Sequence, residues 1–163
     1  MNSTLSKRRE SIEKLERGYI GVLTGLTTMV QSVSSHALYQ RLEGIDTSIG
    51  ENVIKSAGTL EQTLGGLTTN LWDDPFEWTL PETLSTIDLI VEYLQEVEVA
   101  RSRAFARFVD DSALDKYIAV PSGEQKSIQS VLIDALEKAT RYQQRAAELR
   151  KMLSADGAAG FII

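Results

Sequence analysis

The stretch from residue 12 to residue 33, IEKLERGYIGVLTGLTTMVQSV, decides the fold class. Its large apolar residues return in steps of three and four, the spacing that places side chains on one face of an α-helix. This stripe consists of Ile12, Leu15, Tyr19, Val22, Leu26, Met29 and Val33. The sequence therefore predicts a helix over about residues 5–35. Its glycines, at positions 18, 21 and 25, weaken the helix but leave room for a neighbouring helix to approach closely.

A second helix is predicted over residues 48–72. Ser48 and Glu51 have the spacing of a capping box, in which a serine and a glutamate satisfy free backbone donors at the start of a helix. The buried face that follows contains Val53, Ala57, Leu60, Leu64, Leu67 and Leu71. Pro75 then prevents the helix from continuing.

Two more helices are predicted over residues 80–109 and 124–155. Pro81 suits a first helical turn, where its missing N–H would have no partner in any case. Thr79 and Glu82 repeat the capping-box spacing. No run of alternating apolar and polar residues predicts a strand. We therefore expect an all-α protein, an up-down-type four-helix bundle that forms one domain over residues 1–163.

Composition excludes several classes of function. The chain has 23 acidic and 17 basic residues, a net charge of −6, so it offers no broad basic surface for nucleic acid. It has no cysteine, which rules out disulfides and thiolate sites. No segment approaches the roughly 20 consecutive apolar residues of a membrane span, and the N-terminus lacks the apolar core of a signal peptide. We expect a cytoplasmic protein that binds neither nucleic acid nor membrane.

The order of the landmarks resembles that of the DinB-like family. A long first helix precedes the Ser48-Ile49-Gly50 helix start, and an Asp-Pro-Phe-x-Trp loop follows at residues 74–78. The last helix contains Val131-Leu132-x-x-Ala135-Leu136 and then Gln144-x-x-x-x-Leu149-Arg150. The resemblance covers about residues 8–155 and implies a DinB-like bundle that forms a homodimer. The family includes metal-dependent hydrolases and thiol-dependent transferases.

The resemblance also implies where a metal site would lie. The family's three metal-binding histidines fall, by spacing, at Lys55, Lys138 and Tyr142 of this chain, and a further position that is often histidine falls at Asp134. A lysine ammonium has no free lone pair and repels a divalent cation. Two lysines and a phenol do not reproduce three imidazoles. We therefore expect no metal and no cofactor at these four positions, which become candidate pocket residues.

Each of these residues also has a purely structural interpretation. Lys55 could be a solvated lysine paired with Glu51, and Lys138 could pair with Asp134, since both pairs are four residues apart on a helix. Tyr142 could be a core tyrosine whose hydroxyl reaches a polar partner. The only histidine, His36, matches no ligand position, so we expect it on the surface.

The acidic loop after the second helix offers no catalytic arrangement. Asp73, Asp74 and Glu77 have no opposing general acid or base, and a solvated loop is the simpler interpretation. Phe76 and Trp78 are expected to plug one end of the bundle. The glycine pair at residues 65 and 66 is expected to be a packing notch.

Two functions from different classes remain open at this point. The first is a degenerate, non-metal DinB-like protein that serves as a small-molecule-binding or interaction module. The alternative is a hydrolase or thiol-dependent transferase with an active site rebuilt around Lys138, Tyr142 and Asp134. A third option is an acidic protein whose partner is another protein. The missing triad favours a protein that is not an enzyme.

Overall fold

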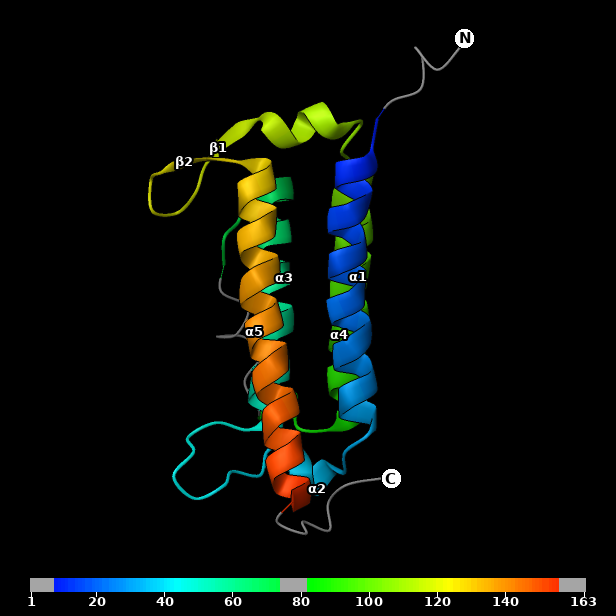
Figure 1. The fold of residues 1–163 in the computed structure, drawn as a ribbon, viewed down its shortest axis with the longest axis vertical. Coiled ribbons are helices and arrows are strands. Elements are labelled where there is room, and N and C mark those ends of the chain that lie inside the picture. The colour runs from blue at the N-terminus through cyan, green and yellow to red at the C-terminus, as the bar shows by residue number, and fades with distance from the viewer. Residues whose placement is uncertain (1–7, 74–81, 156–163) are drawn as a thin grey trace.

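The computed structural model describes residues 8–73 and 82–155, and it confirms the predicted all-α bundle (Figure 1). Four long helices form it: α1 (Glu10–Gln31), α3 (Ile49–Thr69), α4 (Ile87–Ala106) and α5 (Ile128–Ala155). A one-turn helix, α2 (Ser35–Leu38), follows α1. A short 3-10 helix, η3 (Asp111–Asp115), and a hairpin of strands β1 (Tyr117–Ala119) and β2 (Gln125–Ser127) precede α5.

Helices α1 and α5 run in one direction, whereas α3 and α4 run in the other (Figure 1). The contacts between α1 and α5 show the parallel register directly. Gly18 lies against Leu136 and Gly25 against Gln143, so both helices advance by seven residues between the two contacts. Because α3 and α4 are parallel, the connection between them crosses from one end of the bundle to the other, a known variant of the four-helix bundle.

Tyr19 lies at the centre of the core, where it is fully buried. Its hydroxyl donates a hydrogen bond to the Leu132 carbonyl oxygen at 2.9 Å. Its ring meets the Phe105 ring edge to face, with 5.2 Å between the centroids. Burial raises the pKa of the Tyr19 hydroxyl far above its ordinary value, so the phenol stays neutral. This one side chain therefore joins α1, α4 and α5.

Small residues bring α3 and α5 close together. The hydroxyl of Ser56, fully buried on α3, donates to the Ala139 carbonyl oxygen of α5 at 2.7 Å. Ala57 and Ala135 are also buried in the bundle. Since a buried hydroxyl needs a partner, this bond fixes how the two helices lie against each other.

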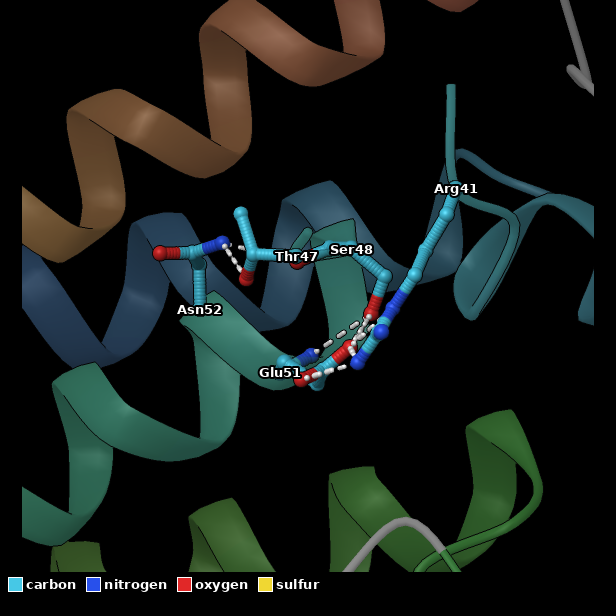
Figure 2. Close-up of polar contacts among 5 residues, drawn as sticks. All are labelled: Arg41, Thr47, Ser48, Glu51 and Asn52. Atoms are coloured by element: carbon cyan, nitrogen blue, oxygen red, sulfur yellow. Dashed lines mark hydrogen bonds and ion pairs between the residues drawn. The ribbon is translucent and has the colours of Figure 1, made fainter. Parts of the chain in front are cut away.

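The predicted capping box at the start of α3 is present (Figure 2). The Ser48 hydroxyl accepts from the Glu51 backbone N–H at 3.2 Å and donates to the Glu51 carboxylate at 3.0 Å. Arg41 holds both oxygens of that carboxylate, with its Nη2 at 2.8 and 3.0 Å. The Asn52 amide donates to the Thr47 hydroxyl and to the Ser48 carbonyl. Figure 2 shows this polar cluster at the start of α3.

The predicted start of the third helix is wrong. The helix predicted over 80–109 begins at Ile87 and ends at Ala106, and Thr86 caps it by accepting from the Leu89 N–H at 3.2 Å. Thr86 also has the extended backbone of a capping residue. Thr79 and Pro81, on which the prediction rested, lie outside the described residues.

The other boundaries differ for identifiable reasons. The predicted helix 5–35 ends at Gln31, and Ser34 caps the separate turn α2. Helix 48–72 ends at Thr69, because Asn70 adopts the left-handed conformation that commonly terminates a helix. Helix 124–155 begins at Ile128, since residues 125–127 are paired with residues 117–119. Strands of three residues are too short to show a detectable alternation.

Close approach explains most of the described helix glycines. A side chain at Gly66 would overlap the Trp72 ring, which occupies the position of an added Cβ. Gly18 and Gly25 similarly accommodate side chains of α5, whereas Gly21 faces open space. These contacts lie within one chain.

Within the described part of the chain, no helix combines the length and the apolar character needed to cross a membrane.

Candidate functional site

The four candidate residues lie on the face shared by α3 and α5. Lys55 belongs to α3, and Asp134, Lys138 and Tyr142 follow one another on α5 at intervals of one turn. The antiparallel packing of the two helices therefore brings together Lys55 and Tyr142, which are far apart in the sequence. The four residues do not all reach the same pocket.

Lys55 and Tyr142 meet each other across the two helices. The Lys55 Nζ lies 6.0 Å from the centroid of the Tyr142 ring, which is the outer limit of a cation–π contact. Both side chains are partly buried, so the interpretation of Tyr142 as a core tyrosine is wrong. The carboxylate of Glu51, the predicted partner of Lys55, is held by Arg41 and Ser48.

Asp134 has a different partner from the one predicted. Its carboxylate lies 3.2 Å from the Nζ of Lys126, the middle residue of β2, and not in an ion pair with Lys138. The hairpin brings Lys126 next to the second turn of α5. Lys138 is exposed, and no acidic partner of its ammonium is found in residues 8–73 or 82–155.

Asp134 and Lys138 line a pocket of about 200 Å³, here named the α3–α5 pocket. Three elements form its walls: α3 contributes Thr59, Gln62 and Thr63, the hairpin contributes Val120 and Lys126, and α5 contributes Val131, Asp134, Ala135 and Lys138. Its volume equals that of about six or seven liquid water molecules. The pocket is therefore large enough for a small molecule only, and its lining combines six polar or charged residues with three apolar ones.

Thr63 is the most informative residue in this pocket. Its side chain is 8% exposed, yet its hydroxyl makes no hydrogen bond with any described residue. The hydroxyl is not among the fully enclosed polar atoms that lack a partner, of which Gln40 Oε1 is the only one in the described residues. It therefore keeps some access to solvent, and the Thr63 side chain is among those that line the α3–α5 pocket. Buried hydroxyls are normally paired, so this one is available to a ligand.

A second, larger hollow is less suited to a ligand. It measures about 500 Å³ and lies where the end of α3 meets Trp72, β1 and the start of α5. Its side-chain polar groups already bind the chain itself: the hydroxyls of Thr68 and Thr69 donate to backbone carbonyls, and Asn70 accepts from the Trp72 indole N–H.

No group of three or more histidine, cysteine, aspartate or glutamate side chains in the described ranges is arranged to hold a metal ion. The donor set at the family positions, two ammonium groups and a phenol, does not fit a divalent metal. No known family model matches this chain, and no curated protein matches it.

Sequence reasoning missed the contributions of Lys126 and Thr63. Lys126 stood in a segment predicted as helix, and only the hairpin places it beside Asp134. Thr63 is three residues from Leu60 and beside Leu64, so it would be taken for an ordinary member of a packed helix face. The predicted surface position of His36 is confirmed. Asp74, Phe76, Glu77 and Trp78 lie outside the described residues.

Proposed function

We propose that this chain is a DinB-like bundle without the family's metal chemistry, and that it serves as a binding module for a small molecule in the α3–α5 pocket. The observation that carries the proposal is the position of that pocket. It is lined by Lys138, one of the three positions that correspond by the resemblance to metal ligands, and by Asp134, the further position that is often histidine. The other two ligand positions, Lys55 and Tyr142, lie on the same pair of helices. Its lining combines three apolar residues with six polar or charged ones, and convergent polar groups fix the orientation of a bound ligand.

The charges at these positions favour binding over catalysis. An acid–base mechanism needs a carboxylate free to exchange a proton with the substrate, whereas the Asp134 carboxylate is paired with Lys126. The alternative proposal, a hydrolase or thiol-dependent transferase with a rebuilt site, would require Asp134 to leave that pair. We also propose, from the family resemblance, a cytoplasmic homodimer. Sedimentation of the chain over a range of concentrations tests the dimer.

Two-dimensional amide NMR tests the binding proposal. The labelled protein is titrated with a set of small fragments that includes carboxylates, phosphates, amines and neutral polyols. We expect at least one class to shift the amides of Thr63, Val131 and Lys138 saturably. The proposal fails if no class shifts them, or if all saturable shifts fall elsewhere.

Metal analysis tests the second part of the proposal, that the chain lacks the family's metal chemistry. Protein prepared without a polyhistidine tag is dialysed and its zinc, nickel, manganese and iron contents are measured. We expect far less than one ion per chain. A stoichiometric ion that is lost in a Lys138→Ala, Tyr142→Phe double variant would show that the family's metal site has survived in altered form.

A further inference from the structure

The charge of the α3–α5 pocket is opposite to that of the whole protein. The chain carries a net charge of −6, yet two ammonium groups, those of Lys126 and Lys138, line this one small pocket, with a single carboxylate, that of Asp134, between them. Asp134 is 55% exposed and already neutralises Lys126. One positive charge, that of Lys138, is therefore left over in the pocket.

The start of α5 adds to this positive character. Val131, another wall of the pocket, lies in the first turn of α5, where the helix dipole favours a negative charge. The Thr63 hydroxyl supplies a nearby donor without a partner in the described chain. A negatively charged oxygen in the pocket would thus meet an ammonium group, a helix start and a hydroxyl.

The remaining walls combine two polar residues of α3, Thr59 and Gln62, with three apolar residues. Val120 of the hairpin and Val131 and Ala135 of α5 line the pocket together with the polar groups. These side chains suit a short hydrocarbon body, and the pocket volume of about 200 Å³ limits its length to a few carbons.

We infer that the ligand of the α3–α5 pocket is a small organic anion, with an oxyanion head held by Lys138 and Thr63 and a short apolar body against Val120 and Val131. This inference rests on the proposed function, because it names the ligand class of the same pocket. Asp134 then has a defined role: its carboxylate neutralises Lys126 and so weakens anion binding in the pocket.

The test uses three probes with the same hydrocarbon body: butyrate, butylammonium and 1-butanol. Each is titrated into the labelled full-length protein, and the amide shifts of the pocket residues are followed. We expect butyrate to bind saturably with a dissociation constant in the millimolar range, and butylammonium and 1-butanol to bind about fivefold more weakly or not at all, since a partly exposed charge pair contributes about 1 kcal/mol. Butyrate binding should also weaken as salt is added.

Substitutions of Lys138 and Asp134 should change the affinity for butyrate in opposite directions. Lys138→Gln should weaken butyrate binding about fivefold, and Lys138→Arg should retain most of it. Asp134→Asn should strengthen butyrate binding severalfold, because it frees Lys126. Lys14→Gln, at an exposed position on α1, is the matched control and should change nothing. These side chains are exposed, so the variants should fold, which the dispersion of the amide spectrum verifies.

Each result separates the inference from the proposed function. Equal or tighter binding of butylammonium or 1-butanol in the pocket overturns the anionic class and leaves the binding module standing. The same holds if Asp134→Asn weakens butyrate binding, or if all three probes fail while another fragment class occupies the pocket. If neither these probes nor the fragment set reaches the pocket, both the inference and the proposed function fail.

Discussion

The carboxylate of Asp111 caps the first turn of α1 by accepting the backbone N–H of Ile12 at 3.0 Å and that of Ser11 at 3.1 Å. Asp111 and Ile12 are 99 residues apart in the sequence. The residue at the capping position itself, Arg9, makes no side-chain cap, and it donates instead to the Phe108 carbonyl oxygen. The start of the first helix is thus completed by η3, the element that follows α4.

Removal of this cap should destabilise the protein. We expect Asp111→Ala to lower the free energy of unfolding by about 1 kcal/mol, the usual contribution of a helix cap. Urea denaturation measures the change. Asp115→Ala, an exposed position in the same 3-10 helix, is the control and should stay within about 0.5 kcal/mol of the parent. Equal effects of the two substitutions would contradict the capping role.

Two glycine substitutions should have opposite effects. Gly66→Ala places a Cβ where the Trp72 ring lies and should cost about 1–3 kcal/mol, because the ring must move. Gly21→Ala adds a methyl group in open space on a helix, so it should stabilise the protein by about 0.5–1 kcal/mol. Thermal unfolding followed by circular dichroism compares both variants with the parent. A destabilising Gly21→Ala would indicate that a second chain covers this face in solution.

Tyr19 and Tyr142 should respond differently to loss of the hydroxyl. Tyr19→Phe removes the buried bond to the Leu132 carbonyl and should cost about 1 kcal/mol. Tyr142→Phe should leave stability within about 0.5 kcal/mol, because Tyr142 is only partly buried and meets Lys55 with its ring. Denaturant titration of both variants provides the measurement, and a comparable loss for Tyr142→Phe would show that its hydroxyl supports the fold.

Glu61 should make stability depend on pH. Burial raises the pKa of its carboxyl above the ordinary 4.5, and the nearby charge of Glu96 raises the pKa further, although the hydrogen bond donated by Tyr93 at 2.7 Å opposes the shift. A raised pKa means that the folded state holds this proton more tightly. The resulting stability is complete below pH 4.5 and is lost as the pH rises through the folded-state pKa.

Glu61→Gln should remove this dependence, because the amide oxygen still accepts from Tyr93 but carries no charge. We expect the variant to be more stable than the parent at pH 7 and nearly equal to it at pH 4. Unfolding curves at several pH values measure the difference, with the exposed Glu148→Gln as the control. If the stability difference between the variant and the parent is the same at both pH values, ionisation of Glu61 is not its cause.

The sequence by itself determined the helices and the face that each one buries. Tyr19, Leu26 and Leu60 belong to predicted stripes, and all are buried, because a period of three to four residues is set by the geometry of the helix alone. The Ser48–Glu51 cap could also be predicted from the sequence, since both partners lie within one turn.

Only the tertiary structure decided the features that depend on distant partners. Asp111 caps α1 from 99 residues away, and the hairpin that places Lys126 beside Asp134 has strands too short to leave a periodic signal. Local spacing predicts which face of a helix is apolar. It carries no information on which side chain from a distant element accepts from a free backbone N–H or lines a pocket. For that reason the sequence identified Asp134 and Lys138 only as candidate residues, whereas the pocket they line and the ion pair of Asp134 with Lys126 depend on the packing of α3, α5 and the hairpin.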